Sequence, residues 1–413
     1  MLPICLIVSC AALLDTSALL LGKADPESAL MLDPLASDIR IDVILSALQQ
    51  ADQDTGEDVI GQVQTGIRLS PIDARFYSLL GILEEQQGDR DAAKELFHYA
   101  LALLPTEIQA LAHMMDASVR AGDLVTASRN MEIIARRWPE YWPKVEAALP
   151  TLLDNPEAFQ TISDRFGPDP LIRRRLIASM TRNDVLLTPA YRMVLAWHEA
   201  GITDLAWSIN SVTNALLRAR RFSDAYSLFV LTRASTNPIT GFVYNGSFSK
   251  PLSGSPFDWQ IRPQAGADIS LVSQRRSSKT EGAAAGEATQ DDKAIAVRFL
   301  GGPLNFSNIS QLTRLTPGSY ELQAGYSSLD LDTPEPLKLG LSCQDGQGEL
   351  GHLDFAPGTA VDERSASFQF SVPAEGCELQ RIETYSARLP LSWRYRYEGT
   401  LFIDYVRVRR QDG

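Results

Sequence analysis

The sequence has few of the residues from which metal sites and nucleophilic centres are built. Four cysteines and four histidines are spread over 413 residues. No two cysteines have C-x-x-C spacing, no histidine opens an H-E-x-x-H motif, and no G-x-S-x-G is present. These absences exclude the zinc sites and the hydrolase site that those motifs mark. We therefore expect no catalytic residue, no metal and no cofactor.

An excess of positive charge is also missing, since the net charge is −13. Residues 1–239 carry 21 basic side chains against 30 acidic ones, and residues 240–413 carry 17 against 21. Nucleic-acid binding needs clustered lysine and arginine to neutralise phosphates. Nucleic acid is therefore not expected as a partner.

A long apolar run extends from Leu2 to Gly22. About 20 apolar residues are enough to cross a bilayer core, so we expect residues 1–22 to tether the protein to the inner membrane, with the rest in the periplasm. A lipoprotein signal is suggested by Ile7-Val8-Ser9-Cys10. A secretory signal would need a basic start that the sequence does not supply. A buried soluble helix stays open because Asp15 interrupts the run.

Proline recurs every 34 residues at Pro71, Pro105 and Pro139, which indicates a helical repeat. Small and large residues stand between them at the spacings of the tetratricopeptide repeat: Tyr77, Leu80, Gly81, Ala93, Phe97, Ala100 and Pro105. The chain resembles tetratricopeptide-repeat proteins over residues 73–139 and, with degenerate repeats, over 23–236. This resemblance implies an α-superhelical array of antiparallel helix pairs, with a groove that binds a protein partner.

Near residue 237 the pattern changes to short β-rich runs separated by glycine and proline turns. The expected strands are Gly241–Ser249, Ala267–Gln274, Lys293–Leu300, Ile309–Leu315, Ser319–Ser328, Leu337–Ser342, Ser365–Val372, Glu378–Ser386 and Thr400–Arg409. Gly346–Gly351 matches G-x-G-x-x-G, but in a β region it is expected to be a hairpin turn. The fold class is therefore multidomain, a helical array followed by an all-β antiparallel sandwich over residues 237–413.

The two ends of this β region resemble the galactose-binding-like jelly rolls of carbohydrate-binding modules. The opening reads Tyr244-Asn245-Gly246-Ser247-Phe248, and the closing strand reads Gly399-Thr400-Leu401-Phe402-Ile403-Asp404-Tyr405-Val406. In that family the final aspartate, here Asp404, often helps to hold calcium. An acidic residue after the phenylalanine usually assists, but this chain has Ser249 there, so Asp404 is only a candidate.

Glycan binding needs flat aromatic faces for sugar rings and polar groups for their hydroxyls. Aromatic and basic residues fall in two expected loops: Trp259, Trp393, Arg394, Tyr395, Arg396 and Tyr397. We expect them to bind polysaccharide, with the arginines suited to acidic sugars. The alternative is that Trp259 and Trp393 cap the sandwich core.

Cys343 and Cys377 lie in two expected strands of the same domain. Such a pair suits a disulfide in an oxidising compartment. Two separate buried thiols are the alternative.

The combination of apolar segment, repeat array and jelly roll is similar to envelope proteins of bacterial exopolysaccharide systems. The similarity implies a non-catalytic scaffold for polysaccharide assembly or export, in which the repeats bind a protein of that machinery. The alternative function is a glycan receptor whose repeats form a stalk.

Overall fold

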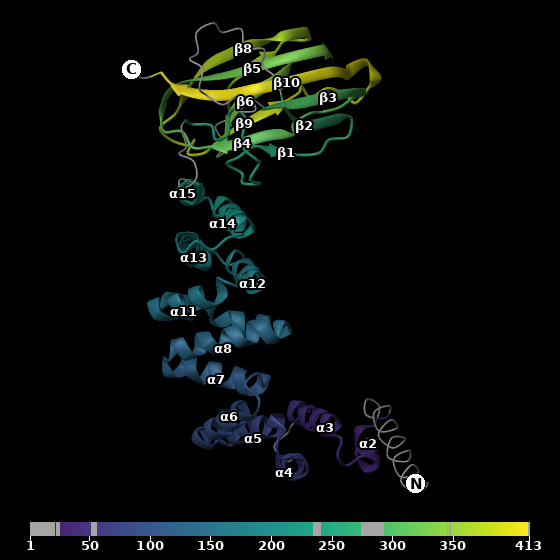
Figure 1. The fold of residues 1–413 in the computed structure, drawn as a ribbon, viewed down its shortest axis with the longest axis vertical. Coiled ribbons are helices and arrows are strands. Elements are labelled where there is room, and N and C mark those ends of the chain that lie inside the picture. Colours follow the sequence, from purple (N-terminus) through teal and green to yellow (C-terminus); the bar gives the residue numbers. More distant parts are fainter. Residues whose placement is uncertain are drawn as a thin grey trace, which may run out of the picture. The chain divides into compact units, whose positions relative to one another are not determined.

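The computed structural model describes residues 21, 25–50, 56–233, 241–273, 293–344, 346 and 348–411. Helices are followed by two antiparallel sheets, which confirms the predicted helical array and β-sandwich (Figure 1). The chain divides into two compact units, Met1–Arg173 and Arg174–Gly413. The change from helix to strand falls between Arg233 and Gln260, and the predicted limit at residue 237 lies outside the described residues.

The predicted apolar segment 2–22 also lies outside the described residues, apart from Leu21. Among the residues that the structure describes, no helix combines the length and apolarity that a bilayer crossing requires.

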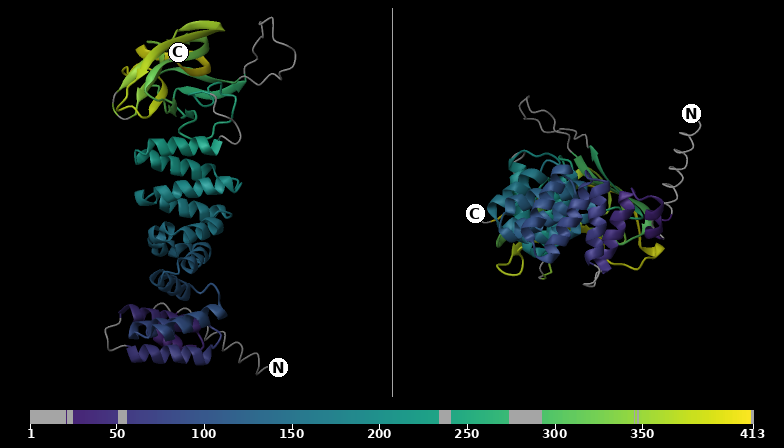
Figure 2. Two further views of the ribbon diagram at one scale, coloured as in Figure 1. Left: turned by 90° about the vertical axis from the view of Figure 1, so that its left-hand side faces the viewer. Right: turned by 90° about the horizontal axis from the view of Figure 1, so that it is seen from below.

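The first unit consists of helices that follow one another as antiparallel pairs (Figure 2). Its α-helices are α2 (Pro26–Leu32), α3 (Ser37–Gln50), α4 (Gly56–Leu69), α5 (Ala74–Gln87), α6 (Arg90–Leu103), α7 (Ile108–Ala121), α8 (Leu124–Arg137), α9 (Trp142–Val145), α10 (Leu149–Asp154) and α11 (Pro156–Phe166).

The turns inside two successive pairs are built from the same two residues, 34 positions apart. Gly88 ends α5 and Gly122 ends α7, each in the left-handed region with φ of 95° and 77°. Glycine adopts this conformation at helix ends without the steric cost of a Cβ. Asp89 and Asp123 then cap α6 and α8 by accepting hydrogen bonds from backbone N–H groups. The turns between paired helices therefore recur with the same period as the prolines.

Most of the predicted signature residues lie at the seam of the α5–α6 pair or at its ends, whereas Leu80 packs on the other side of α5, toward α3 and α4. Ala93, Phe97 and Ala100 are buried in one cluster. A Cβ built on Gly81 would lie 2.8 Å from the Phe97 ring, so the absence of a side chain lets the ring fill the seam. Pro105 follows the end of α6, which it cannot continue because it lacks an N–H and its ring would clash with the preceding turn.

A buried carboxylate joins this pair to the next. Glu107 caps α7 by accepting from the Ala110 N–H at 2.6 Å, and it also accepts from the Ser78 hydroxyl at 2.5 Å. Both side chains are almost inaccessible to solvent. Their hydrogen bonds satisfy polar groups that would otherwise be costly to bury.

The second unit contains helices as well as strands. Its helices are α12 (Pro170–Met180, which begins in the first unit), α13 (Leu187–Glu199), α14 (Ala206–Arg218) and α15 (Phe222–Arg233). Phe229 of α15 packs edge-on against Tyr244 at 5.1 Å, and Tyr226 packs against Phe257 at 5.2 Å between ring centroids. Aromatic rings therefore join the last helix to the segment that leads into the strands.

The sandwich consists of two five-stranded sheets in which all strand pairs are antiparallel. We call β1-β4-β9-β6-β7 sheet A and β2-β3-β10-β5-β8 sheet B. The strands are β1 (Gln260–Ile261), β2 (Ala267–Ser273), β3 (Lys293–Pro303), β4 (Ile309–Thr313), β5 (Gly318–Asp332), β6 (Leu337–Cys343), β7 (Glu349–Phe355), β8 (Gly358–Val372), β9 (Gln380–Tyr385) and β10 (Arg396–Arg410).

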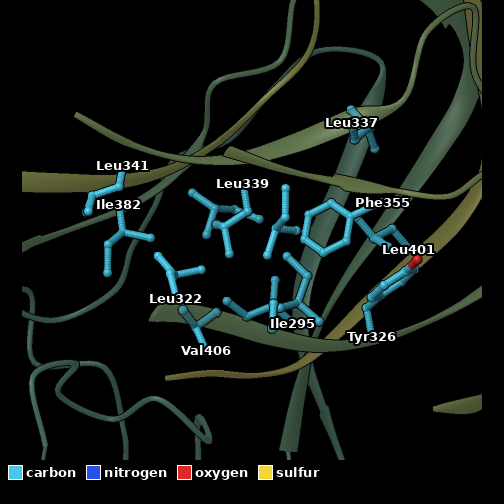
Figure 3. Packing of buried hydrophobic residues seen from close by; sticks show 14 of the residues in the cluster. Ile295, Leu322, Tyr326, Leu337, Leu339, Leu341, Phe355, Ile382, Leu401 and Val406 are labelled. Atoms are coloured by element: carbon cyan, nitrogen blue, oxygen red, sulfur yellow. The ribbon is translucent and has the colours of Figure 1, made fainter. Parts of the chain in front are cut away.

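One hydrophobic core lies between the two sheets (Figure 3). Leu339 and Ile382 from sheet A face Leu322 and Val406 from sheet B, and all four side chains are buried. Successive side chains on a strand point to opposite faces. The residues between these core positions therefore lie on the outer faces.

Eight of the nine expected strands overlap strands in the structure, but Gly241–Ser249 does not form one. Asn245 and Phe248 have positive φ there, and the Asn245 side chain makes two hydrogen bonds to the backbone of Lys250, which closes a loop. Two strands, β1 and β7, were not predicted, and β7 was missed because Glu349 and Gly351 were assigned to a hairpin turn. The turn itself is shorter and ends before Glu349.

Cys343 at the end of β6 and Cys377 before β9 form a disulfide, with Cα atoms 5.0 Å apart. Both residues belong to the buried core of the sandwich. Closing a loop over a sequence separation of 34 restricts the unfolded chain, which stabilises the fold by about 4 kcal/mol in the chain-entropy model.

The glycines of α4 provide a test of the helix packing. A Cβ on Gly66 would lie 2.3 Å from the Phe76 ring, whereas a Cβ on Gly61 would meet nothing within 4 Å. We expect Gly66→Ala to destabilise the protein by about 1–3 kcal/mol through overpacking. The matched change Gly61→Ala should stabilise it by up to about 1 kcal/mol, because alanine favours helix. Thermal unfolding measures both, and equal melting temperatures would contradict this packing.

Candidate functional site

Trp259 was predicted to stack against sugar rings, and this prediction is wrong. The side chain is 1% exposed and packs against Phe248 in the core. Its indole N–H donates to the Asn245 carbonyl at 3.1 Å. With the ring covered and its polar atom satisfied, Trp259 caps the core, which was the alternative interpretation.

The second predicted group spans the end of the loop that joins β9 to β10 and the first two residues of β10, Arg396 and Tyr397, and its members differ in exposure. Trp393 is 75% exposed, Tyr395 is half-buried, and Arg394 and Arg396 are exposed. Tyr397 is 0% exposed and packs against Phe299, so its predicted role in stacking is wrong. This segment therefore offers Trp393 and the two arginines to a ligand.

Asp404, the calcium candidate, is buried in β10. Calcium is held by six to eight oxygen ligands, commonly from several acidic side chains. Across the described parts of the chain, no three residues among histidine, cysteine, aspartate and glutamate are grouped as a metal site would require.

A groove of about 500 Å³ lies on the outer face of sheet A. Strands β6, β7 and β9 are adjacent in that sheet, and their outward residues form its floor. The groove is lined by Asn305, Phe306, Ser307, Gly340, Leu341, Ser342, Glu349, Glu383, Tyr385, Ser386, Ala387 and Arg388. Reciprocal hydrogen bonds between Phe306 and Ser386 fix one wall to the end of β9.

Tyr385 is the aromatic residue of this groove whose ring is accessible. A Cβ on Gly340 of the neighbouring strand would lie 2.7 Å from the Tyr385 ring. The ring therefore occupies the space above a residue that has no side chain, and it lies close against the sheet. This packing fixes the ring orientation before any ligand arrives.

Glu349 holds the polar end of that ring. Its Oε1 accepts the Tyr385 hydroxyl at 2.6 Å and lies 2.8 Å from His352 Nδ1. The Nε2 atom of His352 lies 3.3 Å from Lys338 Nζ. Partial burial and the hydrogen bond to the Glu349 carboxylate both raise the pKa of Tyr385, because they disfavour the charged phenolate.

The sequence contains a signal for this groove that was not among the predictions. In the expected strand Glu378–Ser386, Ile382 and Thr384 alternate with Arg381, Glu383 and Tyr385. Such alternation places a tyrosine and two charges on one face of a half-buried strand. The partners Gly340 and Glu349 lie far away in the sequence, so only the fold shows that they meet.

No family model and no curated protein matches the chain. Among solved structures it is similar to a CBM4 carbohydrate-binding module, with 17% identity, a TM-score of 0.28 and coverage of 41% of this chain and 99% of that one. It is also similar to the CBM22-1 xylan-binding domain of Paenibacillus barcinonensis Xyn10C, with 13% identity, a TM-score of 0.26 and coverage of 41% and 93%. Pseudomonas aeruginosa pilF gives 12% identity, a TM-score of 0.25 and coverage of 49% and 77%. The fold assignment rests on the helices and strands themselves.

A second hollow, of about 520 Å³, lies in the repeat region and is lined by residues of α5, α6, α7 and the start of α8. Glu85 accepts from Arg120 at 3.0 Å and contacts His113 Nδ1 at 2.7 Å, while His113 stacks on Phe97. Burial alone would raise the pKa of Glu85, but the hydrogen bonds from His113 and Arg120 outweigh it and lower the pKa. These contacts give the hollow a hydrogen-bonded, charged wall.

The contact between Glu349 and Tyr385 predicts a change in titration. In Glu349→Gln the negative charge beside the phenol is lost, so the pKa of Tyr385 should fall toward its ordinary value and the phenolate should form at lower pH. Ultraviolet titration of tyrosinate measures this, with Tyr385→Phe in each background subtracted to isolate the one ring. If the pKa of Tyr385 were the same in the wild-type protein and in Glu349→Gln, the contact would be contradicted.

Proposed function

We propose that the β-sandwich binds a glycan chain in the groove of sheet A and that the repeats hold a protein partner. The observation that carries the proposal is the Tyr385 ring, packed over Gly340 with its hydroxyl held by Glu349. The apolar faces of pyranose rings stack on such aromatic faces. Because the ring is already oriented, little conformational entropy is lost when a sugar binds.

The polar lining of the groove suits the hydroxyl groups of a sugar. Glu383, Ser342 and Asn305 supply acceptors and donors around Tyr385. A groove with an apolar platform and a few fixed polar groups is the usual form of a small-ligand site. At about 500 Å³ it falls in the size range of such sites.

The place of the protein in the cell is part of the proposal. The Cys343–Cys377 disulfide suits an oxidising compartment, and the apolar residues 2–22 suit a membrane tether. Together they support a non-catalytic scaffold of the periplasm, attached to the inner membrane and active in exopolysaccharide assembly or export.

A glycan receptor whose repeats form only a stalk is the second candidate. The two functions differ in whether the α5–α8 hollow binds a protein. The hydrogen bonds that hold His113 and Arg120 on Glu85 favour the scaffold, because a spacer needs no ordered charges in a groove.

Glycan binding by the full-length protein tests the proposal. We would titrate it calorimetrically with cellohexaose, xylohexaose, β-1,4-galactan, alginate and polygalacturonate. Tyr385→Ala should weaken binding at least about tenfold, which is about 1.4 kcal/mol. Tyr99→Ala removes a tyrosine that is 50% exposed on α6 and should leave binding unchanged. Binding that survives Tyr385→Ala, or no binding of any polymer, would contradict the proposal.

A further inference from the structure

The two carboxylates of the sheet A groove already have partners. Glu383 lies 3.6 Å from the Arg381 guanidinium and accepts from the Ser307 hydroxyl. Glu349 is engaged by Tyr385 and His352, and His352 is in turn next to the Lys338 ammonium. Both groups are thus engaged within the protein, although, besides burial, their negative charges and that of Asp354 still raise the pKa of Tyr385.

Arg388 differs from these residues because its charge is not offset. It lines the groove three residues after the end of β9, and its side chain is exposed. Within the described part of the chain, no carboxylate is paired with it. A guanidinium in that position can donate two parallel hydrogen bonds to a carboxylate.

The segment that carries Arg388 and leads into β10 is itself basic. Residues 387–396 contain three arginines and no acidic residue, in a chain of net charge −13. Arg394 lies over the Tyr395 ring, and Arg396 reaches Glu398 only at 4.0 Å. Of the three arginines, Arg388 lines the groove, where its positive charge attracts ligands of the opposite sign.

We infer that the groove of sheet A selects anionic glycans, with a sugar carboxylate paired to Arg388 and a neighbouring ring stacked on Tyr385. This inference rests on the proposed function and adds the chemical class of its ligand. Uronic acids supply such carboxylates as part of the sugar ring. Neutral polymers of the same backbone would make the stacking contact and leave Arg388 unpaired.

A matched pair of ligands tests the inference with the full-length protein. Polygalacturonate and its methyl ester have the same rings and linkages, but the ester carries no charge. The wild-type protein should bind the acid at least about tenfold more tightly, and the difference should shrink as salt is added. Arg388→Gln should abolish the difference, and Arg388→Lys should restore only part of it because lysine cannot bind in two-point fashion.

Arg364→Gln is the matched control, since it removes an exposed arginine from β8 of the other sheet. Equal binding of acid and ester by the wild type would overturn the inference. An effect of Arg364→Gln as large as that of Arg388→Gln would also overturn it, because the preference would then reflect net charge alone. If either of these outcomes is found but neutral glycans still bind through Tyr385, the inference fails and the proposed function stands. If no glycan binds, the proposed function fails as well.

Discussion

Both sheets of the sandwich bury one face in a shared core, and this constraint determines where a ligand can bind. On β6 and β9 the buried residues Leu339, Leu341 and Ile382 fix the register. A shift of one residue would expose all of them. The same register therefore places Gly340 next to Tyr385 on the opposite face. The groove of sheet A follows directly from the packing of the core.

A glycine that faces an aromatic ring recurs in both compact units. Gly66 faces Phe76 and Gly81 faces Phe97 among the helices, while Gly325 faces Tyr405 in sheet B. In each case the ring fills space that a Cβ would take, and the elements approach closely. The Gly340–Tyr385 pair differs because its ring is at the surface. The same glycine–aromatic packing thus brings helices or strands close together and, in sheet A, shapes the floor of the groove.

Local patterns predicted much of the fold, whereas the site depends on contacts between distant residues. The proline period and the Gly-Asp turns reveal the repeats because each repeat is a local unit. Alternation revealed most strands, but β7 was missed since only Leu353 and Phe355 mark its core face. Trp259 was assigned to a ligand because sequence alone does not show which face of a loop is covered. Tyr385 went unnoticed because its partners come from β6 and β7.

Fluorine NMR of the full-length protein, with fluorotyrosine at all twelve tyrosines, tests most directly whether glycans bind on sheet A. The Tyr385 and Tyr99 signals are assigned by their phenylalanine variants. Titration with polygalacturonate and with cellohexaose should shift the Tyr385 signal saturably with at least one polymer and leave Tyr99 unchanged. Binding of either polymer without any change at Tyr385 would place the ligand elsewhere and contradict the assignment of the groove.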